Sequence, residues 1–141
     1  MISLVSIKKA IVSKLKKLDI SVISNDIRSG FEKPAFFIQL MPISNDSYGE
    51  YQERIITVNI HYFSDDKTDL DNLKMDDILN RLFVTTLKID NNVLTLYEKR
   101  SEIDDNILQF KFNLIFTECT PIPIDEDIEE YENMEELYMT L

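Results

Sequence analysis

The sequence predicts an α+β fold, in which two helices pack on a mostly antiparallel sheet of about five to six strands. The first reason is a run of alternating apolar and polar residues over 106–117, the pattern of a strand with one buried face. The second is the helical spacing of apolar residues at about 3–18 and 68–83. The third is the order of the remaining strand-like stretches, which gives α-β-β-β-α-β-β-β along the chain.

The run 106–117 is expected to lie at the centre of the sheet. Burial of one large apolar side chain stabilises a fold by roughly 1.5–3 kcal/mol before conformational entropy is subtracted. Other segments must therefore supply its neighbours and the helices that cover it. Five such side chains fall on every second position: Leu108, Phe110, Phe112, Leu114 and Phe116.

Length and composition favour one domain over residues 1–120, followed by an acidic extension at 121–141. With 141 residues and 44% hydrophobic residues, the chain can build one compact core. It has no apolar run of about 18 residues, and lysines interrupt its first segment, so we expect neither a signal peptide nor a membrane anchor. Cys119 is the single cysteine, which rules out an intrachain disulfide and favours synthesis in the cytoplasm.

The first predicted element is an amphipathic helix from about Ser3 to Leu18. A basic helix of this kind can lie on a membrane, bind a partner or cover a sheet, and we expect the last of these. A short edge strand is predicted at 20–27, followed by a loop over 28–34 that contains Gly30 and Pro34. The apolar residues of the helix recur at spacings of three and four: Leu4, Ile7, Ile11, Leu15 and Leu18.

Two strands follow, at 35–43 and 52–63, with the polar stretch 44–51 predicted as an exposed loop. The first has apolar residues on both faces, because Phe37 and Met41 lie opposite the face that carries Phe36, Ile38 and Leu40. This strand is therefore central in the fold, or its second face meets another subunit. The second strand has one apolar face, formed by Ile56, Val58, Ile60 and Tyr62.

The second predicted helix spans about Thr68 to Phe83. Thr68 is a suitable N-cap, and Asp69 and Asp71 fall in the first turn, where the helix dipole favours negative charge. Beyond it, 84–89 and 93–100 form a predicted hairpin around Asp90–Asn92, and a turn is expected at 101–105. The expected buried residues of the helix are Met75, Ile78, Leu79, Leu82 and Phe83.

We find no pattern of catalytic, cofactor-binding or metal-binding residues. His61 is the only histidine, and no nucleophile or orienting group accompanies it in the pattern, so we interpret it as a strand histidine. One histidine and one cysteine do not make a zinc site. An aspartate cluster at 65–71 suggests calcium, but the glycine and the final glutamate of an EF-hand loop are missing. The prediction is a protein that is not an enzyme.

Charge is distributed unevenly along the chain. The net charge is −11, but residues 1–120 hold 18 acidic and 15 basic residues, a net charge of only −3. The segment 121–141 holds eight acidic residues and no lysine or arginine, whereas the first 18 residues hold five lysines and no acid. Opposite charge at the two ends suits head-to-tail association of copies, although a solvated helix face and a solubilising tail would give the same pattern.

The acidic extension also carries apolar residues at helical spacing. We predict a short acidic helix that docks on a neighbouring subunit or on a partner protein, and the alternative is an acidic segment without structure. The residues that would make this contact are Ile128, Tyr131, Met134 and Tyr138.

Several of these features together resemble the tail terminator family of phages and prophages of Gram-positive bacteria. The resemblance covers about residues 1–120. It rests on the lysine-bearing first helix, the loop with Gly30 and Phe31, the run KPAFFIQL at 33–40, the long strand through Tyr62, the second helix with its hairpin, and the strand with Phe110 and Phe112.

The resemblance implies a structural protein of the virion or of a phage-tail-like particle, with no catalytic residues. Such a protein forms a ring of six copies on the last ring of the tail tube, ends tube growth, and meets the neck or connector and in some tails a sheath. DNA passes through the ring, so no specific nucleic-acid binding and no cofactor are expected. The alternatives are another neck or head-completion ring protein, or a small acidic binding protein. Candidate interface residues are Phe37, Met41, Tyr48, Tyr51 and the four of the acidic extension.

Overall fold

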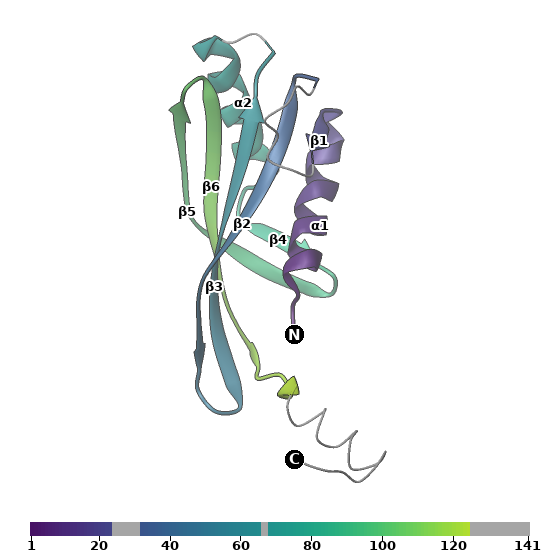
Figure 1. Ribbon diagram of the computed structural model, residues 1–141, viewed down its shortest axis with the longest axis vertical. Coiled ribbons are helices and arrows are strands. Elements are labelled where there is room, and N and C mark those ends of the chain that lie inside the picture. The colour runs from purple at the N-terminus through teal and green to yellow at the C-terminus, as the bar shows by residue number, and fades with distance from the viewer. Residues whose placement is uncertain (24–31, 66–67, 125–141) are drawn as a thin grey trace, which may run out of the picture.

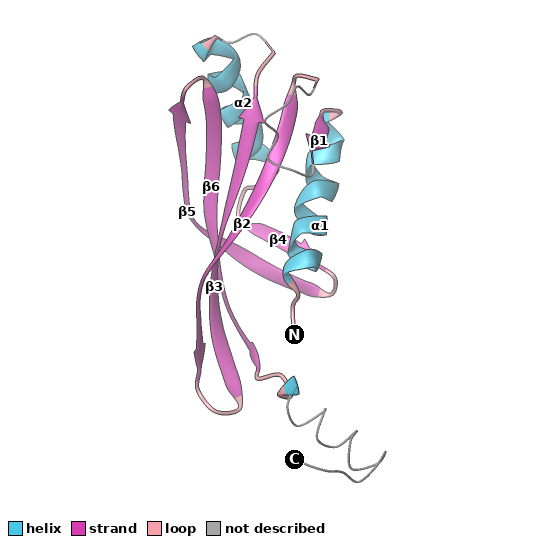
Figure 2. Cartoon of the chain, viewed as in Figure 1, coloured by secondary structure: helices cyan, strands magenta, loops and turns pink. Residues whose placement is uncertain are grey.

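The computed structural model describes residues 1–23, 32–65 and 68–124. One six-stranded sheet, in the order β1-β2-β3-β6-β5-β4, carries helices α1 and α2 against the same core (Figures 1 and 2). The predicted α+β class and the order α-β-β-β-α-β-β-β are confirmed. The elements are α1 (Leu4–Leu15), the 3-10 turn η1 (Lys16–Leu18), β1 (Ser21–Ile23), β2 (Ala35–Ser47), β3 (Tyr51–Phe63), α2 (Asp69–Leu82), β4 (Thr86–Ile89), β5 (Asn92–Asp104) and β6 (Ile107–Cys119).

The strand predicted to be central is β6, and it lies between β3 and β5. Its five alternating apolar side chains are all buried, as the period of two requires. Phe110 and Phe112 lie opposite Ile60 and Val58 of β3, and both rings contact Phe83 at the end of α2. The core is therefore a single layer of side chains between the sheet and the two helices.

Helix α1 covers the sheet as expected. The Ser3 hydroxyl accepts a hydrogen bond from the backbone N–H of Ser6 at 3.0 Å, which caps the first turn. Ile7, Ile11 and Leu15 are fully buried in the core. Neither α1 nor α2, in the ranges that the structure describes, is long and apolar enough to cross a lipid bilayer.

Helix α2 begins at the predicted cap, but one of its predicted core residues is wrong. The Thr68 hydroxyl accepts from the backbone N–H of Asp71. Ile78 is 38% exposed, whereas Asn72 is fully buried and donates to the carbonyl of Asn106 at 3.2 Å. Spacing alone could not choose Asn72, because a buried amide is acceptable only when a partner such as this carbonyl is present.

The predicted edge strand is present at residues 21–23 as β1, which pairs with β2 in parallel. Its partners run from Ser21↔Ala35 to Ile23↔Phe37. The remainder of the predicted strand, and the predicted loop up to residue 31, lie outside the described residues.

The predictions for 44–51 and 101–105 as a loop and a turn are wrong in extent. β2 continues to Ser47 and pairs with β3 as far as Ser47↔Gln52, and β5 continues to Asp104. The true turns are Tyr48–Glu50 and Asp105–Asn106. These strand ends are exposed on both faces, so their sequences lack the alternation that burial imposes, while the backbone ladder still holds them extended.

Candidate assembly surfaces

Three strands extend beyond the helices as an arm, which Figure 1 shows reaching past the first residues of α1. We define the arm as residues 43–47 of β2, 51–55 of β3 and 115–119 of β6. β3 is its middle strand, since Gln52 lies opposite Ser47 on one side and Glu118 on the other. A three-stranded arm is stiffer than an isolated hairpin, which is marginally stable in water.

The tip of the arm is held by all three strands. The backbone N–H of Tyr48 donates to the carbonyl of Tyr51 at 2.8 Å, and Gly49 has a φ of +82°, which a residue with a side chain rarely adopts. Thr120, just beyond β6, donates its N–H to the Glu50 carbonyl at 2.9 Å and its hydroxyl to the Gly49 carbonyl at 2.7 Å. The turn is thus fixed from the side of β6 as well as by its own hairpin.

Two of the predicted interface residues, Tyr48 and Tyr51, lie together at this tip. Their rings stack with centroids 5.4 Å apart and an angle of 24° between the planes. Tyr48 is 53% exposed and Tyr51 is 50% exposed. Paired tyrosines offer a large contact area at low cost in side-chain entropy, which is why they are frequent at protein interfaces.

Both edges of the arm lack a neighbouring strand among the described residues. The β1 ladder ends at Phe37, so the edge of β2 beyond that residue pairs only with β3. On the other side the ladder between β5 and β6 ends at Leu96↔Leu114, so β6 from Ile115 onward also pairs only with β3. Exposed strand edges carry unpaired backbone groups that can bind a strand of another chain.

A buried polar cluster fixes the arm to the body of the protein. The Arg54 guanidinium donates to the Ile2 carbonyl at 2.6 Å and lies 3.3 Å from a carboxylate oxygen of Glu118. Gln52 donates to this same oxygen, Oε2, at 2.6 Å. The other oxygen, Oε1, accepts a hydrogen bond from the backbone N–H of Ile2 at 2.8 Å. Both charged side chains are about nine-tenths buried, so the cluster locks the start of the chain against β3 and β6.

Burial of the Glu118 carboxylate raises its pKa, but the hydrogen bonds that it accepts outweigh this effect. Those from the Ile2 N–H, Gln52 and Arg54 place the pKa below its ordinary value of 4.5. Arg54 was not among the residues predicted to form a site, although it lies two positions before Ile56 of the apolar face of β3. Its even spacing from Ile56 places it on the core face of β3, and this was the available signal for a buried partner.

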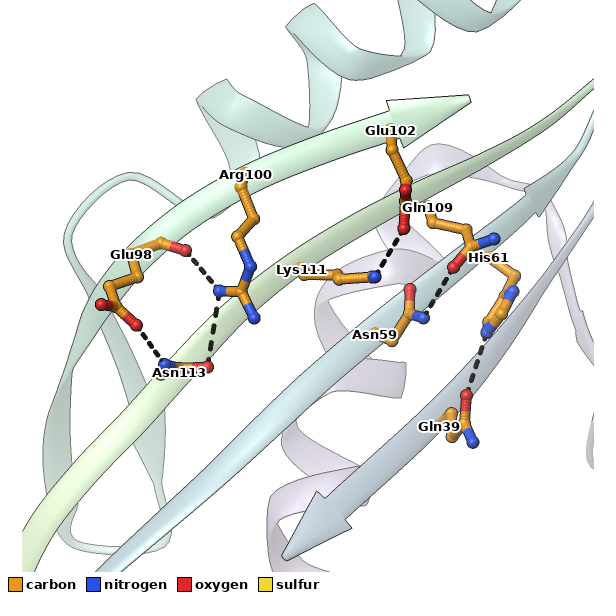
Figure 3. A network of polar contacts seen from close by, with 9 residues as sticks. All are labelled: Gln39, Asn59, His61, Glu98, Arg100, Glu102, Gln109, Lys111 and Asn113. Carbon is orange, nitrogen blue, oxygen red and sulfur yellow. Dashed lines mark hydrogen bonds and ion pairs between the residues drawn. The ribbon is translucent and has the colours of Figure 1, made fainter. Parts of the chain in front are cut away.

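The sheet face opposite the helices is polar, and in the described part of the chain no helix covers it. Figure 3 shows the side chains that line it, from β2, β3, β6 and β5. Lys111 forms an ion pair with Glu102 at 2.6 Å, and this contact lowers the Glu102 pKa. Asn113 accepts from Thr57 at 2.8 Å and donates to Glu98 at 2.5 Å. The face therefore carries side chains of both positive and negative charge.

Phe37 and Met41, two further predicted interface residues, lie on the same polar face. Phe37 is half-buried, with its ring 5.5 Å from that of His61 on β3. Met41 is half-buried opposite Thr57. His61 also contacts Gln39 at 3.3 Å (Figure 3), an arrangement typical of a strand histidine. The structure thus brings two predicted residues to this face and two to the tip of the arm.

The remaining predictions from the sequence concern the aspartate cluster at 65–71 and the acidic extension. Within residues 1–23, 32–65 and 68–124, no group of three or more metal-ligating side chains is found. Asp71 belongs to the aspartate cluster at 65–71 and accepts hydrogen bonds from the hydroxyls of Tyr62 and Ser64. These bonds connect α2 to the end of β3. Burial and the hydrogen bond to Asp71 raise the Tyr62 pKa to about 12. Ile128, Tyr131, Met134 and Tyr138 lie outside the described residues.

Comparison with known proteins identifies the family. No curated protein matches the chain. One solved structure shares 13% sequence identity with it at a TM-score of 0.45, over 86% of this chain and 98% of the other, and this likeness is too weak to indicate a function. A family model described as "phage tail terminator protein" matches residues 6–126, which is most of the chain. The chain therefore belongs to the phage tail terminator family, a family of structural proteins that complete the tail of the virion.

Proposed function

We propose that this chain forms a ring of six copies on the head-proximal end of the tail tube. There it ends tube polymerisation and joins the tube to the neck or connector, in a phage, prophage or phage-tail-like particle of a Gram-positive bacterium. Membership of the terminator family supports this role. The role needs no catalysis and no cofactor.

The observation that carries the proposal is the arm. A closed ring needs two different surfaces on each subunit, one that reaches out and one that receives the next copy. The arm reaches out from the helices, its tip is fixed by Thr120, and both of its edges can accept a strand. The polar sheet face, with half-buried Phe37 and Met41, is the surface that we assign to the neighbouring subunit.

The tip of the arm is assigned to the tube. Tyr48 and Tyr51 are the most exposed aromatic pair in the described part of the chain, and their stacking gives them a fixed shape. A fixed aromatic surface is suited to a repeating target, such as the last ring of tube subunits, because little entropy is lost on binding. A sheath, where the tail has one, would lie outside this contact.

Charge is consistent with passage of DNA through the ring. A protein that presents many basic groups to DNA binds its phosphates through counterion release. The net charge of this chain is −11, and its sheet face pairs Lys111 with Glu102. A ring of such subunits would let a genome pass without holding it.

The test is the length of tail tubes in a strain that lacks the gene. If the chain ends polymerisation, electron microscopy will show tubes of widely varying length, most of them without heads, and the intact gene supplied in trans will restore one length. Tubes of normal length in the deletion strain would refute the proposal. Tubes of normal length that fail to join heads would instead indicate a neck protein.

A further inference from the structure

One flank of α1, continued by the first residue of η1, combines lysines with valines. We call Val5, Lys8, Lys9, Val12 and Lys16 the α1 stripe. Val5 is 63% exposed, Lys9 and Lys16 are exposed, and Lys8 is half-buried. Val12 is also half-buried, because part of its side chain packs against the core. An exposed valine flanked by lysines is not needed to cover the sheet, because the opposite side of the helix already does so.

Two hollows flank this stripe and share its central residues. A groove of about 500 Å³ lies between α1 and β1, and a second hollow of about 450 Å³ lies along the outer side of the helix. Lys8, Val12 and Lys16 line both. An apolar side chain that lies against Val12 would therefore have lysines on either side of it.

The stripe is positively charged. The ion pairs between described residues are Arg54–Glu118 and Lys111–Glu102, so no lysine of the stripe is in a described ion pair, although one carboxylate, that of Asp19, lines the groove beside Lys8 and Lys16. Lys14 differs, since it turns inward, donates to the Leu82 carbonyl at 2.9 Å and lies over the Phe83 ring. The stripe is thus a surface for a negatively charged partner with apolar groups.

We propose that the α1 stripe binds the acidic segment 125–141 of a neighbouring copy in the ring. The inference rests on the proposed ring. This segment supplies eight carboxylates and no lysine or arginine. In a helix, its apolar residues from Ile128 to Tyr138 would span roughly 15 Å, close to the roughly 16 Å from Val5 in α1 to Lys16, the residue that follows the helix. Charge and length therefore both match the stripe.

The point where the described chain ends favours a neighbouring copy. Thr120 is fastened to Gly49 and Glu50, so the acidic segment leaves from the tip of the arm. The arm points away from the helices of its own subunit (Figure 1), and it is the part that we assign to contacts outside the subunit. In the sequence the segment follows the β6 edge of the arm, which pairs only with β3 and is open to a neighbouring copy, rather than the tyrosine pair that we assign to the tube.

Matched charge reversals in the full chain test this contact. The stripe variant is Lys9→Glu with Lys16→Glu, and the segment variant is Glu129→Lys with Glu136→Lys. The control, Lys74→Glu with Arg81→Glu, makes the same charge change at exposed positions of α2. In 50 mM salt we expect roughly tenfold or greater weakening of self-association in the first two, since each reversal replaces attraction with repulsion, and none in the control. Sedimentation velocity measures this.

A mixture of the two variants distinguishes a neighbouring copy from the same copy. Each variant alone should remain dissociated at a concentration where the natural chain forms rings. Mixed in equal amounts, they should form rings of the natural mass, because each segment now meets a stripe of opposite charge on the next subunit. Rings formed by either variant alone, or no rings in the mixture, would overturn the inference. Circular dichroism on each variant establishes that the fold is intact.

The outcome for this contact is separable from the outcome for the proposed function. If the stripe variant forms rings and ends tubes at their normal length, the contact does not exist, although the terminator role stands. If the natural chain does not control tube length, the terminator role fails, whatever the variants do in solution.

Discussion

The Tyr48 ring stacks on the Tyr51 ring across the tip of the arm, with centroids 5.4 Å apart and both side chains about half exposed. An exposed cross-strand aromatic pair contributes roughly 0.5–1 kcal/mol to the stability of a hairpin. This is a small part of the stability of a domain, but the pair is also the largest exposed aromatic surface at the tip. The two tyrosines can therefore be changed with little effect on folding.

The first prediction concerns these tyrosines. Replacing both with serine should lower the free energy of unfolding by about 1 kcal/mol or less and should abolish control of tube length, because the tip loses its contact surface. Thermal denaturation and electron microscopy of tails measure the two effects. Val84→Ser, at an exposed site away from the arm, is the control. Normal tubes with the double variant would show that the tip does not contact the tube.

The second prediction concerns the ion pair at the base of the arm. Arg54→Met leaves the Glu118 carboxylate buried with fewer donors, so we expect a loss of about 3 kcal/mol in the free energy of unfolding. The double variant Arg54→Met with Glu118→Leu removes both charges and should recover most of that loss. Urea denaturation measures both. Equal loss in the single and double variants would show that the pair is not what fixes the arm.

The third prediction is a pH dependence that arises from Glu118. Hydrogen bonds place its pKa in the folded protein below 4.5, despite the opposing effect of burial. An acid with a lower pKa in the folded state stabilises the protein above its unfolded pKa, and this stabilisation is lost as the pH falls through the folded value. In the Glu118→Gln variant the melting temperature should therefore fall less steeply as the pH is lowered from about 5 to about 3. If the melting temperature of the variant fell with pH as steeply as that of the natural chain, Glu118 would not be the source of this pH dependence.

The fourth prediction tests the two faces of the central strand. Phe112→Ala should cost roughly 3–5 kcal/mol, because the ring is fully buried against Phe83 and Phe110. Lys111→Ala, one position earlier on the polar face, should cost about 1 kcal/mol or less, since its ion-pair partner Glu102 is exposed and water screens the pair. Denaturation in urea measures both variants. Similar costs would mean that the polar face is packed more tightly than the described chain shows.

The predictions from sequence were most accurate for elements in which burial of one face gives the apolar residues a regular spacing. Strand β6 was predictable because Phe110 and its alternating neighbours must all face one core. The arm was missed at Asn45 and Asp46, where neither face of β2 is buried and only the backbone ladder defines the strand. Sequence alone cannot show a ladder of this kind, since every residue type can join it.

The candidate surfaces could be predicted from the sequence only in part. Exposed aromatic residues in a polar stretch indicated Tyr48 and Tyr51, but nothing in their spacing indicated that the rings stack. The polar face depends on which strands are neighbours: Lys111 meets Glu102 only because β5 pairs with β6 in one register. Contacts between strands depend on register, and register is set by the whole fold.

The most direct test of the terminator role is to find where the chain lies on the tail. Cryo-electron microscopy of purified tails should show one ring of this chain, at the end of the tube that faces the head, with the arm tip against the last ring of tube subunits. Density for the chain along the whole tube, at the opposite end, or nowhere on the tail would contradict the account.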